Sequence, residues 1–139
     1  MDLPDALAFA RDRKNGTLVT IGATGRPQIS NIMFVPGPGD TLRISITDDR
    51  VKTRNLRRDQ RASLYVQGDN FWTWVVLDAS AELSPVAADP HDATVDALVE
   101  YYRAGSGEHP DWAEYRAAMV SDHRLVLTLH VERAYGLGV

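Results

Sequence analysis

Cysteine is absent from this chain of 139 residues, and lysine occurs only at Lys14 and Lys52, against thirteen arginines. Because the chain has no thiol, four features are excluded: disulfides, thiolate zinc sites, cysteine nucleophiles and iron–sulfur clusters. No apolar run approaches the ~18 residues of a membrane-spanning helix, and the first residues are acidic where those of a signal peptide are basic. We therefore expect a single cytoplasmic domain over residues 1–139, with no membrane partner.

The sequence signatures of several enzyme classes are also missing. There is no Gly-x-Ser-x-Gly, no Gly-rich phosphate loop ending in Lys-Ser or Lys-Thr, and no Gly-x-Gly-x-x-Gly after a strand. These absences argue against a hydrolase, a P-loop protein and a Rossmann dehydrogenase. The histidines occur singly and no two have the helical spacing of metal ligands, so we expect no metal site.

Positive charge is concentrated in one segment of an acidic chain. Residues 50–61, RVKTRNLRRDQR, carry six basic side chains and one acidic one, a net charge of +5. Since the whole chain carries -4, the other 127 residues carry -9. This distribution does not favour nucleic acid, but it does favour a site for a compact anion such as phosphate. A solvated basic turn is the alternative interpretation.

The hydrophobic pattern predicts a mainly β (α+β) fold with short peripheral helices. We expect helices after Pro4, after a cap at Asp48 or Asp49, after Asp89-Pro90 and after Pro110. Apolar alternation and turn residues predict six strands, at residues 17–23, 28–35, 41–47, 62–67, 71–83 and 124–131. Residues 36–40, PGPGD, are expected to form a loop. Because hairpins join most of these strands, we predict a six-stranded antiparallel barrel rather than parallel βαβ units.

Two groups of polar residues are candidates for ligand binding. Arg50, Lys52 and Arg54 alternate beside a strand end, so an extended chain would point them the same way toward a phosphate. A second group lies in an otherwise apolar strand and could border a planar heteroaromatic ring or bond a neighbouring loop; it consists of Gln28, Ser30 and Asn31.

Three further residues flank these groups. Ser45 lies on the polar face of the strand that precedes the basic segment and could add a hydroxyl to the same site. Trp72 and Trp74 alternate on one predicted strand and would face the same side, as anchors of a core or subunit interface or as a stacking wall for a ring.

Several stretches of the sequence together resemble one known family. They are GRPQISNIMF from Gly25, RVKTRNLRRDQRASLYV from Arg50, EYYRAGSGEHPDWAEYRAAMV and the ending HVERAYGL. With the Trp-rich strand, they are similar to the split β-barrel flavin and deazaflavin oxidoreductases related to pyridoxamine 5'-phosphate oxidase. More narrowly, the chain resembles the actinobacterial branch that uses coenzyme F420, and the similarity runs from about Gly16 to Gly136.

This resemblance implies a homodimer with two cofactor sites at the subunit interface. By position, Lys52 and Arg50 would bind the cofactor phosphate, assisted by Thr53. The ring system would be bordered by Gln28, Ser30 and Asn31, and the pocket would be lined by Ser45 and Ile46. Trp72 and Trp74 would approach from the partner subunit, and Arg57 and Arg58 would attract the polyglutamate tail of F420 or form salt bridges.

The resemblance predicts an F420H2-dependent reductase that passes a hydride to an electron-poor double bond of a small molecule. One alternative is an FMN-dependent oxidoreductase of the same fold, either a flavin reductase or an oxidase of pyridoxamine phosphate. The oxidase is disfavoured because the C-terminus lacks an Arg-x-His type of segment. A second alternative is a non-catalytic binder of F420, FMN or a tetrapyrrole. No side chain stands out as an obligatory acid or base, so no catalytic residue is predicted.

Overall fold

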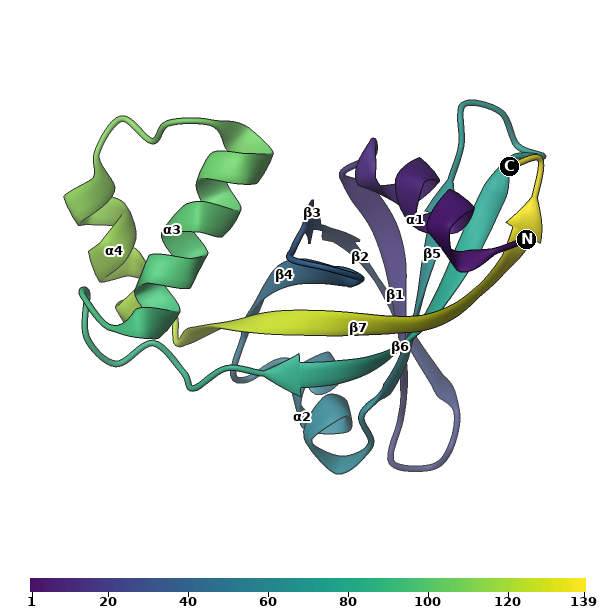
Figure 1. Ribbon diagram of the computed structural model, residues 1–139. Helices are drawn as coiled ribbons and strands as arrows, with labels where there is room; N and C mark the ends of the chain where they lie inside the picture. The colour runs from purple at the N-terminus through teal and green to yellow at the C-terminus, as the bar shows by residue number, and fades with distance from the viewer.

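A computed structural model describes all 139 residues, and its strands form one antiparallel sheet in the order β2-β1-β5-β6-β7-β4-β3 (Figure 1). The elements are α1 (Leu3–Arg11), β1 (Asn15–Ile21), β2 (Pro27–Met33), β3 (Val35–Pro36), β4 (Thr41–Thr47), α2 (Val51–Arg58), β5 (Arg61–Gln67), β6 (Trp74–Leu83), α3 (Ala93–Ser106), α4 (Trp112–Ser121) and β7 (Arg124–Leu137). None of the four helices combines the length and apolar character needed to cross a membrane.

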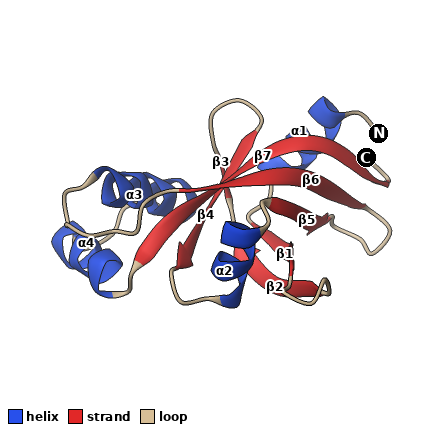
Figure 2. Ribbon diagram, turned by 90° about the horizontal axis from the view of Figure 1, so that it is seen from below, coloured by secondary structure: helices blue, strands red, loops and turns tan.

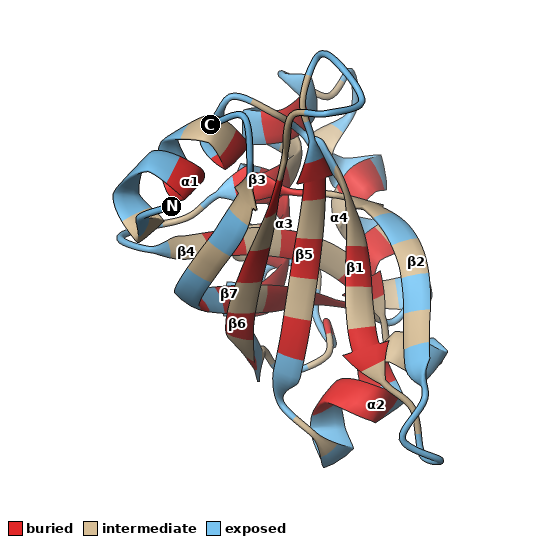
Figure 3. Cartoon of the chain, turned by 90° about the vertical axis from the view of Figure 1, so that its right-hand side faces the viewer, coloured by how far each residue is buried: buried red, intermediate tan, exposed pale blue.

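The sheet curls around a hydrophobic core that follows from strand alternation. In β4, for example, Leu42, Ile44 and Ile46 are buried while the residues between them are half-buried on the other face. Twenty buried residues form this core, and Leu7 of α1 belongs to it. Figure 3 shows the alternation as bands along β1, β5 and β6.

Helices α3 and α4 form a separate layer on the outer face of the sheet. Their apolar stripes, which include Leu98 of α3 and Tyr115 of α4, pack with Val126 of β7 in a second cluster of seven buried residues. Asp92 and Asp111 accept hydrogen bonds from backbone N–H groups at the two helix starts. The helix pair stands to one side of the barrel, beside β4 and the start of β7 (Figure 1).

The rest of the outer face carries exposed apolar side chains. Ile29, Tyr135 and Leu137 are 61%, 49% and 50% exposed. Strand register aligns Ile29 with Val19, and Tyr135 with Val76, on this same face. We call the surface formed by the outward side of β2, β1, β5, β6 and the C-terminal half of β7 the open face.

The structure corrects four expectations about the elements. The sheet has seven strands, because the predicted strand 28–35 ends at Met33 and Val35–Pro36 pairs with Leu42 and Arg43 as a separate strand; of these two residues, only Pro36 was expected in a loop. Strand β7 continues beyond residue 131 to Leu137, because residues 133–137 pair with β6 after a bulge. The other two corrections concern α2 and β6, which lie at the candidate site.

Helix α2 begins after Arg50, which makes no side-chain cap, so the predicted cap at Asp48 or Asp49 is wrong. The reason is that Asp48 pairs with Arg57, whereas Asp49 accepts a hydrogen bond from the Thr47 hydroxyl. Strand β6 begins at Trp74 rather than Phe71, because the turn after β5 extends through Thr73.

Candidate functional site

Basic and polar side chains from four elements line a pocket of about 300 Å³ where the barrel is split. We call it the basic pocket; its residues are Ser30 and Asn31 of β2, Ser45, Ile46 and Thr47 of β4, Arg50 and Lys52 at the start of α2, and Arg124 of β7. Curling of the sheet brings β2, at one edge, near β4, next to the other edge. The pocket therefore gathers six of the residues predicted from sequence.

The junction between β4 and α2 positions the two basic residues of α2. The buried Thr53 hydroxyl donates to the Thr47 carbonyl at 2.7 Å, and the Arg50 amide donates to the same oxygen at 3.3 Å. These bonds fix the first turn of α2 against the end of β4 (Figure 2). Thr53 thus lies behind the pocket wall, while Arg50 and Lys52 form part of that wall.

Three cations share the basic pocket, and no carboxylate lines it. The Lys52 ammonium donates to the Ser30 hydroxyl at 3.4 Å, and Arg124 donates to the Ser45 hydroxyl at 3.4 Å. Burial lowers the pKa of Lys52, and the positive charges of Arg50 and Arg124 lower it further. Repulsion between these three positive charges costs free energy, and a bound anion would offset that cost.

The two carboxylates nearest in sequence to the pocket residues, Asp48 and Asp49, each have a partner within the protein. Asp48 lies 2.7 Å from the Arg57 guanidinium, and Asp49 accepts a hydrogen bond of 2.8 Å from Thr47. This hydrogen bond lowers the pKa of Asp49. Neither acid lines the pocket, but the positive charge of Arg50 also lowers the pKa of Asp49, so Asp49 offsets part of the charge of Arg50. Lys52 and Arg124 have no carboxylate partner.

Unpaired strand edges also border the pocket. Strand β2 pairs only with β1, and residues 44–47 of β4 pair with β7 but have no strand on their other side. Main-chain N–H and C=O groups at these edges need partners. Together with the Ser30 hydroxyl and the Asn31 amide, they offer alternating donors and acceptors to a planar heteroaromatic molecule.

Some predicted site residues lie outside the basic pocket. Gln28 accepts a hydrogen bond from Thr20 at 2.8 Å, and Arg57 pairs with Asp48. Trp72 is 69% exposed in the turn before β6, while Trp74 belongs to β6 and stacks on Tyr65 with ring centroids 6.0 Å apart. The prediction that the two tryptophans alternate on one strand is therefore wrong, because that strand starts at Trp74.

The reason given for grouping Arg50, Lys52 and Arg54 is also wrong. Only Arg50 has extended backbone; Lys52 and Arg54 lie in α2, so period-two alternation does not apply. Arg54 turns back and donates to the Asp49 carbonyl at 2.9 Å. The third cation of the pocket is Arg124 rather than Arg54, because β4 and β7 pair in a register that sets Arg124 opposite Thr47. No local sequence signal marks Arg124, because its role depends on this long-range pairing.

Comparison with known proteins agrees with this architecture. A family model described as pyridoxamine 5'-phosphate oxidase matches residues 3–138. The chain belongs to the pyridoxamine 5'-phosphate oxidase family. The family resemblance inferred from the basic segment and the flanking strands is thereby confirmed, and the curled sheet is the split β-barrel of this family.

Solved structures with the same fold have several described roles. The match to the conserved hypothetical protein Rv2991 of Mycobacterium tuberculosis covers 99% of this chain and 84% of the Rv2991 chain, with a TM-score of 0.74 and 22% sequence identity. An F420 reductase matches 92% and 94%, with a TM-score of 0.68 and 22% identity. The heme storage protein HutZ of Vibrio cholerae matches 99% and 96%, with a TM-score of 0.67 and 20% identity. At such identities the likeness establishes the fold alone.

Proposed function

We propose that this member of the pyridoxamine 5'-phosphate oxidase family binds coenzyme F420 at the basic pocket and is an F420H2-dependent reductase of electron-poor double bonds. The observation that carries the proposal is the cluster of Arg50, Lys52 and Arg124, with no carboxylate among them. A phosphate held there gains charge-assisted hydrogen bonds of about 1.5–3 kcal/mol each.

The residues around the pocket fit the rest of the cofactor as well. Arg50, Lys52 and Arg124 would hold the phosphate, and the polar groups of Ser30 and Asn31 would border the ring. When bound, the reduced deazaflavin supplies the hydride. The chain itself orients the ring, holds the phosphate charge and excludes water. No carboxylate or histidine lines this pocket, so we propose that solvent supplies the proton to the substrate.

The further cations of α2 favour F420 over FMN. Arg54 donates to the backbone of Asp49, and Arg58 donates to the Ile21 carbonyl and the Asn55 side chain; neither pairs with a carboxylate. One phosphate would not neutralise these charges in addition to the three of the pocket. A cofactor with further carboxylates on its tail would, although Arg57 is already paired with Asp48.

The ligand itself is tested by titration of the purified protein with F420, FMN and haem. F420 at 100 times its dissociation constant is expected to stabilise the protein by about 2.7 kcal/mol, read as a thermal shift. Fluorescence titration then gives the affinity directly. Tight binding of FMN with no effect of F420 would overturn the assignment of the cofactor.

Turnover separates a reductase from a non-catalytic binder. The protein is supplied with F420H2, and the rate at which F420H2 is oxidised is measured. This rate is expected to be higher when an activated alkene is added than when it is omitted. Haem is disfavoured as the resident ligand because none of the four histidines lines the basic pocket, and histidine is a common axial ligand. Binding of F420 without any alkene-dependent oxidation would leave only the storage role.

We further propose that two copies associate through the open face, which carries the exposed Ile29, Tyr135 and Leu137. The exposed pair Phe71 and Trp72, packed edge to face at 4.9 Å, would then reach the partner subunit from the turn between β5 and β6. Two exposed aromatic side chains at one turn are typical of interface anchors.

Replacing Ile29 with aspartate tests this dimer. The wild-type protein is expected to have twice the chain mass in solution, and I29D to raise the dimer dissociation constant at least tenfold. The reason is that burying an unpaired carboxylate costs more than the ~1.4 kcal/mol of a tenfold change. Sedimentation equilibrium measures both proteins. Ala117→Asp on the exposed side of α4 is the control and should stay dimeric; an unchanged I29D dimer would place the interface elsewhere.

A further inference from the structure

The hydroxyl group of one buried tyrosine lies where the barrel splits. Tyr101 of α3 is only 9% exposed, and its hydroxyl donates to the Met33 carbonyl at 2.9 Å. Met33 is the last residue of β2, the edge strand that carries Ser30 and Asn31 of the basic pocket. Helix α3 packs beside β3 and β4 (Figure 1). The hydroxyl therefore connects the helix layer to the end of a strand that lines the pocket.

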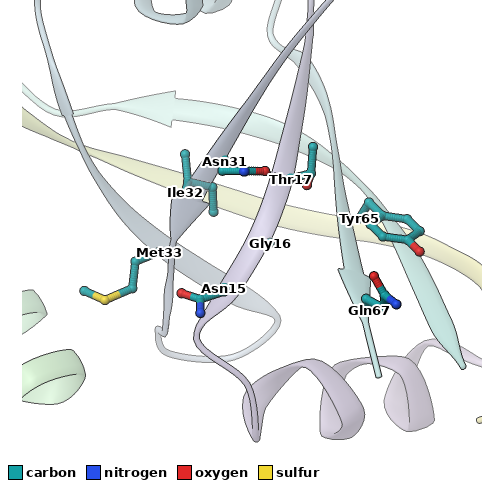
Figure 4. Close-up of a pocket in the computed structure, with 8 residues that line it drawn as sticks. All are labelled: Asn15, Gly16, Thr17, Asn31, Ile32, Met33, Tyr65 and Gln67. Carbon is teal, nitrogen blue, oxygen red and sulfur yellow. Dashed lines mark hydrogen bonds between the residues drawn. The ribbon is translucent and has the colours of Figure 1, made fainter. Parts of the chain in front are cut away.

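Packing around Met33 also fixes the end of β2 against α3. In Figure 4 the Met33 side chain points away from Thr17 and Asn31. Its methyl group lies against Gly105 of α3, where an added Cβ would be only 3.0 Å from it. Tyr101 and Gly105 are one helical turn apart, so they lie on the same face of α3. This face contacts both the main chain and the side chain of Met33.

The same hydroxyl faces the edge of β4. The Val126 carbonyl accepts from the Ser84 N–H at 3.0 Å, and the Val126 N–H donates to the Ser84 hydroxyl at 2.8 Å. Ser45 pairs with Val126, so the main-chain groups of Ser45 point away from β7, toward the open edge. Burial raises the pKa of Tyr101, whereas a hydrogen bond with the Ser45 backbone acts against that rise. The Tyr101 oxygen therefore lies between the Met33 carbonyl and the Ser45 N–H.

The register of β3 and β4 shows which interaction the hydroxyl replaces. Val35 pairs with Arg43, and the same register continued by two residues would set Met33 opposite Ser45. The Met33 carbonyl and the Ser45 N–H, which both point into this gap, would then bond directly. The strand pairing does not include these two residues. Instead, the Tyr101 hydroxyl lies between them.

Continued pairing of these strands would also close the basic pocket. Two residues further along the same register, Asn31 would lie opposite Thr47, and both of these residues line the pocket. Their main-chain groups would then bond to each other rather than to a ligand. The pocket therefore exists because the pairing of the two strands ends beside Tyr101.

We propose that Tyr101 is a positioning residue of the candidate site. Its hydroxyl, inserted between β2 and β4, prevents these strands from pairing and keeps the basic pocket open for its ligand. This inference rests on the proposed function for the identity of that ligand, F420. It does not rest on the proposed function for the spacing of the two strands.

Replacing Tyr101 with phenylalanine removes the hydroxyl and keeps the ring. The Met33 carbonyl and the Ser45 N–H then lose their partner, so we expect them to bond to each other and the strands to close. A crystal structure of the ligand-free variant should place the Met33 oxygen about 2.9 Å from the Ser45 nitrogen. Fluorescence titration should show F420 bound about tenfold more weakly or worse, as expected when one charge-assisted hydrogen bond is misplaced.

Tyr102→Phe is the matched control. It removes a hydroxyl from the next residue of α3, whose ring packs against Trp112 and Tyr115. Both its affinity for F420 and its spacing of β2 and β4 should equal those of the wild type. The melting temperature of Y101F should stay within about 4 °C of the wild type, because the new bond between the strands offsets the lost ones. A merely structural tyrosine would instead lower the melting temperature and leave the affinity for F420 unchanged.

The outcomes keep this inference apart from the proposed function. Strands that stay apart in Y101F would show that the hydroxyl does not cause the split. Closed strands with an unchanged affinity for F420 would overturn its role in the site. Both results leave the proposed function standing. Failure of the wild-type protein to bind F420 would overturn the proposed function, while the strand spacing in Y101F would still decide the role of Tyr101.

Discussion

Replacing Lys52 with alanine is expected to weaken F420 binding by about 1.5–3 kcal/mol, or roughly tenfold to 150-fold. Lys52 is partly withdrawn from water beside Ser30, and two further cations face the same pocket. A phosphate there would lose one charge-assisted hydrogen bond and one attractive charge. Fluorescence titration of the variant with F420 measures the change.

The only other lysine offers a matched control. Lys14 donates to the Gly105 carbonyl and does not line the basic pocket. Lys14→Ala should leave the affinity for F420 unchanged. Equal affinities of K52A and the wild type would instead make the basic segment a solvated surface.

Stability provides an independent readout of Lys52→Ala. Burial and two neighbouring cations lower the pKa of Lys52 from 10.5, so the unfolded chain binds its proton more tightly than the folded protein does. The contribution of Lys52 to the free energy of unfolding therefore rises as pH increases toward 10.5. K52A should lack that part of the rise. At neutral pH the ligand-free variant should differ from wild type by less than about 0.5 kcal/mol, because removing Lys52 also removes repulsion.

Replacing Leu64 with alanine is expected to lower the free energy of unfolding by about 2–5 kcal/mol. Leu64 is fully buried at the centre of β5, where register sets it between Leu18 and Leu77, which are also fully buried. A Cβ added at Gly16 would lie 2.9 Å from the Leu64 side chain, so the surroundings are close-packed. The cavity left by the substitution therefore cannot collapse freely.

Urea denaturation at one protein concentration measures this loss. Val51→Ala is the control, because Val51 is 50% exposed at the start of α2 and its replacement should change stability by about 0.5 kcal/mol or less. A loss below 1 kcal/mol for L64A would mean that the barrel core is less tightly packed at β5 than the buried contacts indicate.

Elements with strong local patterns were predictable from the sequence. The strand over residues 41–47 is confirmed at both ends, because apolar side chains alternate through its whole length. Helix α1 begins close to Pro4, as its position in a first turn predicts, and Asp2 caps it. By contrast, the two-residue strand β3 has too few side chains for any period, and only its pairing with β4 defines it.

Part of the candidate site could likewise be predicted from the sequence, and part could not. Local composition revealed the basic residues Arg50 and Lys52 and the polar residues of β2, because charge and polarity stand out against their neighbours. It did not reveal that Arg124 lines the same pocket, because Arg124 comes to lie opposite Thr47 only when β7 pairs with β4. Nor did it separate Trp72 from Trp74, because the turn before β6 extends as far as Thr73.

The sequence by itself determined that this protein has no thiol chemistry, carries +5 within an acidic chain, and alternates its apolar residues as a mainly β domain. Only the tertiary structure decided where that charge acts. Curling of the sheet brings β2 near β4, and the basic pocket lies where these two strands meet the start of α2. This pocket is assembled from strands distant in sequence, and the strand register that joins them depends on burial of the whole core.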